Sequence, residues 1–429
     1  MGFVSRCAPA LGLVYLASSA YAQSTSEPEE TGFSIAGQTT WINQRKGSFK
    51  AAYTGPNSLI PSAERSYSYT ASAALAWRAG NGLSFELHPE AAQGVPLSKL
   101  TGLGGFPNNE LARTSGANLT VYRARAFARK LFKLEDDKQL VITVGNLSVI
   151  DLFDQNDFSH DPRRQFMNWS LVTHGAFDYA ADARGYTWGA AAEYITPNYS
   201  VRFGRFIQPK ESNGLKLNPR ISESFGDQLE LELPHKNSLG EGKTRWLAFH
   251  NQAVMGRFDD ANSLGAATNT TPAIGNVRAA HSKVGVGMAL EQNVGSLGGI
   301  FARASLHDGK TETYSFTEID RSISAGFLGN GNEWKRPKDT WGGAFVVNGL
   351  SKSHQQYLQA GGLGFFIGDG NLSYKSEKIV ELFYSLALPT ETLGVRSFVT
   401  LNYQRIENPG YNSTRGPASI IGARLHLNF

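Results

Sequence analysis

Three arginines at alternate positions of one short segment are the first residues in this sequence that could do chemistry. The segment "YRARAFARKLF" carries Arg123, Arg125 and Arg129 among small and apolar residues. Successive side chains of an extended strand point to opposite faces, so these guanidinium groups share one face, together with Phe127. Guanidinium groups bind carboxylates and other oxygen acceptors through paired hydrogen bonds. The segment therefore predicts a cationic, hydrogen-bonding surface.

Carboxylates lie on segments that could face these arginines. In "LSFELHPE", Glu86 and Glu90 alternate with apolar residues, and further candidates on similar segments are Glu193, Glu230 and Glu232. Arginines facing carboxylates across a narrow passage would keep it near neutral, which favours uncharged polar solutes over simple ions. Arg and Asp side chains also bind hydroxyl groups, and aromatic faces stack on the C–H faces of sugar rings. These residues therefore predict a polar constriction, although pairing that merely braces the loops is the alternative for each residue.

Two connections between the segments are much longer than a tight turn requires. The first, about residues 93–120, contains "LGGFPNNELAR" with Glu110 and Arg113. The second, about residues 147–183, contains "SHDPRRQFMNWSLV" with Asp161, Arg163 and Trp169. Its spacing is compatible with a short helix from Arg163, with Asp161 as the cap and proline at the first helical position. We expect both long loops to fold inward or to cover a mouth.

The elements that position these residues are strands, because about ten residues of alternating polarity recur along the chain. In "YSYTASAALAWRA", Tyr67 to Trp77 share one face and small polar residues take the other. About sixteen such segments begin near residues 33, 66, 83, 121, 139, 184, 199, 226, 244, 281, 298, 313, 340, 376, 394 and 418. The pattern is typical of a transmembrane antiparallel β-barrel with long loops folded into its lumen, an all-β fold.

A secreted β-sandwich or β-helix is the competing fold. A sandwich usually keeps to fewer residues per domain, whereas the alternation here continues for roughly 400 residues without a boundary. Three arginines on a lipid face would each cost several kcal/mol near the midplane, so a barrel would turn them inward. Tyr122, Ala124, Ala126 and Ala128 would then face lipid. The final strand, ending at Phe429, must pair with the first, near residues 33–45, because an open edge leaves unpaired backbone groups in the bilayer.

The N-terminus predicts export. Residues 1–22 read as a signal peptide, with the apolar stretch "APALGLVYLASSA" followed by a small-x-small cleavage site, and Cys7 is the only cysteine. Residues 23–32 form a short N-terminal segment, and the barrel occupies residues 33–429. A net charge of +4 is too small to indicate a nucleic-acid partner. We find no metal-binding or nucleotide-binding motif and expect no cofactor.

An enzyme is the third class of function that we weighed. His160, Ser170 and His174 lie in one loop, without a nucleophile-elbow pattern. Glu230 and Glu232 share one strand face, a spacing that arises by chance in any alternating strand. We therefore expect no enzymatic activity.

Several motifs resemble those of the carbohydrate-selective porins of the OprB type. They are "GFPNNELAR", "DFSHDPRRQFMNW", "ARGYTWG", "FTEIDRSISAG", "NGLSKSHQQYLQAGGLGFFIGDG" and "YQRIENPGYNSTRGPASIIGARLHLNF". The resemblance runs from about Phe33 to Phe429 and implies a sixteen-stranded outer-membrane barrel for facilitated diffusion of glucose and other small sugars. It also implies a pore narrowed by inward-folded loops, a role that we transfer to Arg123, Arg125, Arg129, Glu110, Arg113, Asp161, Arg163 and Trp169.

The runner-up function is a general or weakly anion-preferring porin, because clustered arginines attract anions. In both cases the expected partners are small solutes and outer-membrane lipid. Monomer and homotrimer are left open, because a lipid-facing strip and a subunit-facing strip look alike in sequence.

Overall fold

The computed structural model describes residues 31–315, 318–390 and 394–429, so the predicted signal peptide lies outside the described residues. The described chain forms one closed antiparallel barrel of sixteen strands, each paired with its neighbours in sequence. The strands are β1 (Gly32–Lys46), β2 (Glu64–Gly80), β3 (Leu83–Val95), β4 (Thr120–Lys133), β5 (Gln139–Leu147), β6 (Thr187–Ile195), β7 (Ser200–Ile207), β8 (Phe225–Asn237), β9 (Gly240–Gly256), β10 (Arg278–Val294), β11 (Gly298–His307), β12 (Arg321–Gly331), β13 (Arg336–Gly349), β14 (Glu377–Leu388), β15 (Arg396–Glu407) and β16 (Ala418–Asn428). The predicted fold class is confirmed.

The barrel closes between the first and last strands. β1 pairs with β16 from Gln38 opposite Asn428 to Lys46 opposite Ile420. The backbone N–H of Phe429 donates to the carbonyl of Gly37 at 3.0 Å, and the N–H of Gly37 donates back at the same distance. The C-terminal aromatic residue therefore completes the closing ladder, as an edge in a bilayer requires.

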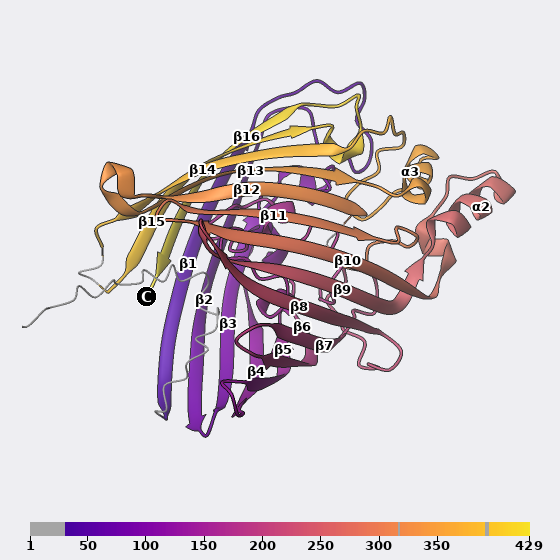
Figure 1. The fold of residues 1–429 in the computed structure, drawn as a ribbon. Helices are drawn as coiled ribbons and strands as arrows, with labels where there is room; N and C mark the ends of the chain where they lie inside the picture. Colours follow the sequence, from indigo (N-terminus) through magenta and orange to yellow (C-terminus); the bar gives the residue numbers. More distant parts are fainter. Residues whose placement is uncertain (1–30, 316–317, 391–393) are drawn as a thin grey trace, which may run out of the picture.

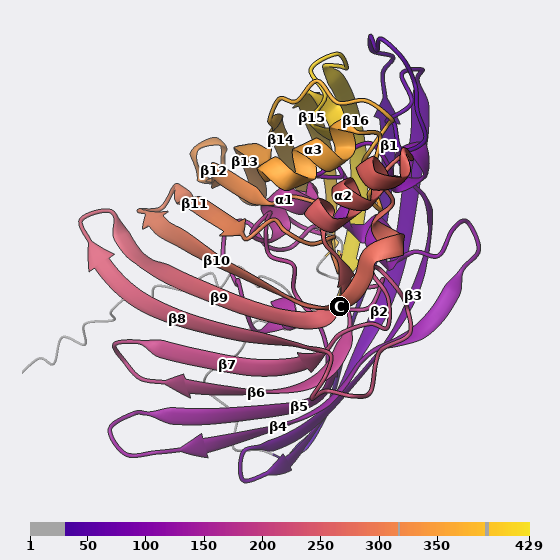
Figure 2. The same cartoon turned by 90° about the vertical axis from the view of Figure 1, so that its right-hand side faces the viewer.

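The connections differ sharply between the two ends of the barrel. Tight turns join β2 to β3, β4 to β5 and their successors at the end that holds the C-terminus (Figure 1). The opposite end carries the long connections and the helices, which are α1 (Trp169–Val172), α2 (Phe258–Thr268) and α3 (Lys352–Gln359). In outer-membrane barrels short turns face the periplasm, so the long connections lie on the cell exterior. Figure 2 shows the strands surrounding an interior that contains α1.

Side chains alternate between an apolar outer face and a polar inner face. In β2, Ser66, Ser68 and Thr70 are buried inside, whereas the tyrosines between them face outward. The ring of Trp41 in β1 stacks on that of Tyr67 at 5.8 Å. Such pairs form the aromatic girdle at the edge of the apolar band. No helix in the described part of the chain is both long and apolar enough to cross a bilayer.

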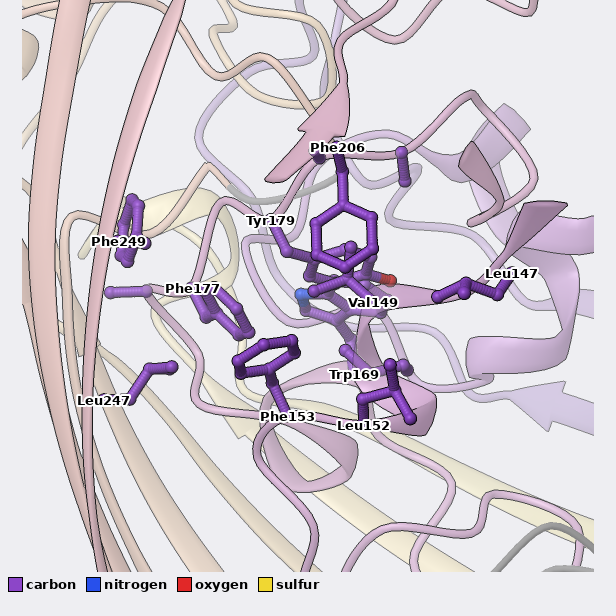
Figure 3. Close-up of a cluster of buried hydrophobic side chains, with 14 of the residues drawn as sticks. Leu147, Val149, Leu152, Phe153, Trp169, Phe177, Tyr179, Phe206, Leu247 and Phe249 are labelled. Carbon is purple, nitrogen blue, oxygen red and sulfur yellow. The ribbon is translucent and has the colours of Figure 1, made fainter. Parts of the chain in front are cut away.

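Part of the lumen is filled by an apolar cluster built from the loop between β5 and β6. Figure 3 shows aromatic side chains of this loop packed together against inward residues of the wall. Its principal members are Phe153, Trp169, Phe177, Tyr179, Phe206, Leu247 and Phe249. The loop is therefore a packed core inside the barrel, and it fixes where a passage can run.

The predicted strand starts lie within four residues of the observed ones except at one place. The segment expected from residue 313 forms a strand only from Arg321. The backbone N–H groups of Tyr314 and Ser315 donate instead to the carboxylate of Asp178 in the lumen, at 3.0 and 2.7 Å. These backbone groups are bonded inside the lumen, so this part of the chain does not pair with the neighbouring strands of the barrel.

Candidate functional site

A polar cavity of about 150 Å³ lies between the lumen loops and the wall formed by β1, β2, β4 and the last two strands. A buried water needs roughly 10–15 Å³ of such volume, so the cavity has room for on the order of ten waters. It is lined by Ala36, Gly37, Gln38, Ser72, Ala74, Asn109, Glu110, Arg113, Arg125, Ile150, Asp151, Gln155, His160, Asp161, Pro162, Arg163, Arg164, Val172, Arg396, His426, Asn428 and Phe429. Both long loops thus contribute to one site.

Two arginines and two glutamates interlock at the wall of this cavity. Arg163 donates from Nε to Glu110 at 2.8 Å and from Nη2 to Glu90 at 2.9 Å. Arg113 donates from Nε to Glu110 at 3.0 Å and lies 3.7 Å from Glu90. Both carboxylates are 1 % exposed, so each charge is compensated almost entirely by its guanidinium neighbours. We call these four residues the charge cluster.

Neutral groups complete the hydrogen bonding of the charge cluster. The hydroxyl of Thr70 donates to Glu110 at 2.6 Å. Tyr122 and Tyr186 donate to Glu90 at 2.6 and 3.0 Å. Each carboxylate therefore accepts from both cationic and neutral donors, which fixes the loop residue Glu110 against the strand residues Thr70 and Glu90 of the barrel wall.

A second ion pair borders the same cavity. Arg125 makes a bidentate contact with Asp151, with both donor–acceptor distances 2.5 Å. Its guanidinium carbon lies 5.2 Å from the ring centre of Tyr186. Asp151 is the last residue of a short helical turn, Val149–Asp151, and its carboxylate also accepts the N–H of the capping residue Ser148. The loop between β5 and β6 thus delivers the carboxylate that holds Arg125 at the cavity.

The loop carboxylates of the site keep their charge. Burial by itself raises the pKa of Glu110, but Arg163 and Arg113 outweigh it and leave this pKa below its ordinary value. Burial likewise opposes ionisation of Asp151, and the contact with Arg125 lowers its pKa overall. Both groups are therefore ionised at neutral pH.

Arg123 does not face the lumen, and this part of the sequence prediction is wrong. Ala124 is an extra residue in β4, because His88 pairs with Arg125 and Pro89 pairs with Arg123. Such a β-bulge reverses the facing of every residue beyond it. Arg123 is consequently exposed on the outer face, 5.1 Å from the ring centre of Trp188. Tyr122, expected to face lipid, points inward to Glu90.

Trp169 lies in the predicted loop but does not line the cavity. It is 1 % exposed in the apolar lumen cluster and stacks on Phe106 at 5.2 Å and on Tyr179 at 6.2 Å. The helix also begins later than expected, because Asn168 accepts the N–H of Ser170 and caps it there. Asp161 caps only a turn, accepting the N–H of Arg163.

The remaining predicted residues divide into two groups. Glu110, Arg113, Arg125, Asp161 and Arg163 line the cavity, and Glu90 lies directly behind it in the charge cluster. Glu86 and Arg129 face inward elsewhere: Glu86 contacts His88 at 2.8 Å, and Arg129 donates to Thr143 at 3.3 Å. These two side chains stiffen the wall beside the site.

Sequence reasoning missed two cationic residues of the cavity. Arg164 lies 4.6 Å from the ring centre of Phe398, and Arg396 begins β15. With them the lining holds five arginine side chains against three side-chain carboxylates. Glu90, directly behind the lining, adds a fourth carboxylate, which leaves an excess of one positive charge. Arg164 follows Arg163 directly in "RRQ", so the doublet was the available signal.

Inner-wall carboxylates hold the two loops in place. Glu381 accepts the N–H groups of Met167 and Asn168 at 2.7 and 2.9 Å. Glu377 accepts those of Gly104 and Gly105 at 3.2 and 2.8 Å. Because these two wall carboxyl groups accept from four backbone N–H groups, the loops cannot shift without losing those hydrogen bonds.

The residues that we weighed for catalysis have other partners. The hydroxyl of Ser170 accepts from Asn348 at 2.9 Å, and His174 contacts Asp154 at 2.7 Å. Glu230 and Glu232 face the same way, as predicted, and share Arg202 at 3.0 and 3.2 Å. Across residues 31–315, 318–390 and 394–429, no group of three or more His, Cys, Asp or Glu could hold a metal ion.

Comparisons with known proteins agree with this geometry. The structure of OprB from Pseudomonas putida at high pH has a TM-score of 0.72 and 18% identity, covering 93% of this chain and 94% of its own. OmpT of Vibrio cholerae, an outer membrane protein folded in vitro, has a TM-score of 0.50 and 11% identity, covering 94% of this chain and 99% of its own. These likenesses concern the fold.

The comparison of the sequence with protein-family models identifies the family of this chain. A search of curated proteins gave no match. The family model described as carbohydrate-selective porin, OprB family, matches residues 58–429, which is most of the chain and includes every residue of the charge cluster. The protein therefore belongs to the OprB family of carbohydrate-selective porins.

Proposed function

We propose that this outer-membrane sugar channel selects its solute at the cavity bordered by the charge cluster and by Arg125. The observation that carries the proposal is the convergence of both lumen loops on one polar cavity whose charges are fixed by ion pairs. Sugars move down their gradient through weak, sequential contacts there, since tight binding would trap them.

The site offers hydroxyl groups many partners of fixed orientation. Arg163 commits two of its five N–H donors to Glu90 and Glu110 while it lines the cavity. Amide and imidazole groups of Asn109, Gln155 and His426 line it as well. A sugar can exchange its hydration for these donors and acceptors one hydroxyl at a time, with no chemical step and no cofactor.

A weak preference for anions is the second candidate function, and the excess of one positive charge among the side chains of the cavity lining and the charge cluster favours it. The charge lowers the energy of a small anion in the lumen and raises that of a cation. A neutral sugar is insensitive to this difference. One channel can therefore perform both functions, and experiments can distinguish them by comparing charged solutes with neutral ones.

A swelling assay in proteoliposomes tests the proposal. The purified protein is exposed to a neutral hexose, a hexuronate, an amino sugar and a zwitterionic amino acid, and the initial swelling rates are compared. We expect the hexose to enter faster than a zwitterionic amino acid of similar mass, and Arg163→Gln to reduce that advantage. Equal rates for hexose and amino acid in the wild-type protein would refute sugar selectivity at this site.

A control variant shows whether selectivity arises at the cavity or in the lumen as a whole. Arg202 is an inward arginine on β7 that is paired with Glu193, Glu230 and Glu232, away from the cavity lining. Arg202→Gln should leave the ratio of hexose to amino-acid rates unchanged. A change as large as that of Arg163→Gln would assign selectivity to the lumen as a whole.

A further inference from the structure

A group of cationic side chains faces outward at the external end of the barrel. Arg45, near the end of β1, is exposed and lies directly opposite exposed Arg65 of β2. Both project from the outer face, since Lys46 and Ser66 beside them are buried inside. Like charges directly opposite in a sheet repel each other, so this pair requires a countercharge.

The described chain does not supply that countercharge. Neither Arg45 nor Arg65 forms an ion pair with any residue that the structure describes. Two other outward arginines of the rim are neutralised: Arg205 contacts Asp227 at 2.6 Å, and Arg278 contacts Glu312 at 2.7 Å. Arg123 of β4 instead lies against an aromatic ring, that of Trp188. Arg45 and Arg65 thus differ from these arginines, because they lie directly opposite each other with neither a carboxylate nor an aromatic ring assigned to them among the residues that the structure describes.

Neighbouring strands extend the group. Arg405 of β15 and Lys378 of β14 are exposed at outward positions, and Arg321 begins β12. Glu407 lies opposite Lys378, so these two strands carry one carboxylate against two cations. We call Arg45, Arg65, Arg321, Lys378 and Arg405 the outer cationic patch.

The surface directly below the patch identifies its partner. Trp41 and Tyr67 of the aromatic girdle stack two to four residues inward from Arg45 and Arg65, roughly 7–13 Å along the strands. Exposed apolar side chains follow, among them Ile421 at 64 % and Leu401 at 65 % exposure. A cationic rim above an aromatic and apolar band matches a lipid with phosphate in its headgroup and acyl chains below.

We propose that the outer cationic patch binds a phosphate-bearing lipid of the outer leaflet, with Arg45 and Arg65 on one phosphate group. Two guanidinium groups provide paired donors for phosphate oxygens, and the phosphate removes the repulsion between them. A second copy of this chain is the poorer occupant, because it would bring no anion to the patch unless it used a different face.

Native mass spectrometry of the full protein in neutral detergent tests the proposal, with bis-phosphorylated lipid A as the probe. Each cation near a phosphate surface contributes about fivefold to binding, so the double variant Arg45→Gln with Arg65→Gln should bind roughly 25-fold more weakly. Arg205→Gln, which alters an ion-paired arginine on the other side, should change binding less than twofold. Conductance should be unchanged in both variants.

Several results of these measurements would refute the proposal. Unchanged lipid binding in the double variant refutes the proposal, and so does displacement of the lipid by equimolar inorganic phosphate. Loss of an oligomeric species in the variant would assign the patch to a second copy instead. If the Gln variant does not fold, Arg45→Lys with Arg65→Lys should retain binding, and added salt should weaken wild-type binding; salt-independent binding refutes the proposal.

Discussion

Replacing Glu110 by glutamine tests the charge cluster most sharply. Glu110 lies on a loop and is held by Arg113, Arg163 and Thr70, so the isosteric amide keeps its shape and one acceptor while removing one negative charge. The cavity lining and the charge cluster would then carry an excess of two positive charges instead of one. We expect the variant channel to favour anions more strongly than the wild type.

The magnitude follows from Coulomb's law. At about 7 Å one unit charge changes the energy of a permeating monovalent ion by roughly 0.6 kcal/mol in water, and by more at the lower effective dielectric of the lumen. Roughly 0.6 kcal/mol corresponds to about a threefold change in local concentration. Because anion and cation change in opposite directions, the permeability ratio should shift by about tenfold.

The assay is the reversal potential of a planar bilayer in a potassium chloride gradient kept near 0.1 M, where screening extends over about 10 Å. Glu223→Gln is the matched control, because it removes the same charge from an exposed pair with Arg220. Its ratio should equal that of the wild type. If Glu110→Gln shifts the ratio less than twofold while it remains folded, the charge cluster does not control the permeating ion.

Three further predictions concern single residues and pH. Arg125→Gln should alter sugar block of the current whereas Arg123→Gln should not, because the bulge at Ala124 turns Arg123 outward; equal effects in single-channel recordings would contradict the assigned facing. Trp169→Ala should lower the free energy of unfolding by about 3–5 kcal/mol, whereas exposed Trp334→Ala should cost under about 1 kcal/mol, as measured by denaturant titration. The stabilisation from ionised Glu110 is present above the ordinary pKa of 4.5 and is lost as pH falls through its lower folded value. The difference in ion selectivity between the wild type and Glu110→Gln should therefore stay constant from neutral pH to 4.5 and shrink only below it; a difference that shrinks between pH 7 and 5 would contradict this assignment.

The fold could be predicted because the alternation of polar and apolar residues carries the strand pattern directly. Sixteen predicted segments correspond to β1 to β16, and the closing pair of strands is where the sequence placed it. The start of β12 was misplaced because the backbone N–H groups of Tyr314 and Ser315 donate to Asp178, a partner far away in sequence. Local periodicity contains no information about such a contact.

The site was predictable only in part, for two physical reasons. A single extra residue in β4 exchanged the faces of Tyr122 and Arg123. Pro89 marked this place, because proline cannot donate to a sheet ladder and is tolerated at bulges. Trp169 was misplaced for a different reason: an aromatic residue in a lumen loop can line a passage or fill a core, and only the packing of Phe106 and Tyr179 against it decides.

Single-channel conductance with titrated glucose tests the central claim most directly. The protein is inserted into a planar bilayer, and glucose, maltose and an amino acid are added in turn. The structure predicts that the sugars reduce the current in a saturable way, that the amino acid does not, and that Arg125→Gln weakens the block. Full conductance at all glucose concentrations would contradict a sugar-selective constriction in this channel.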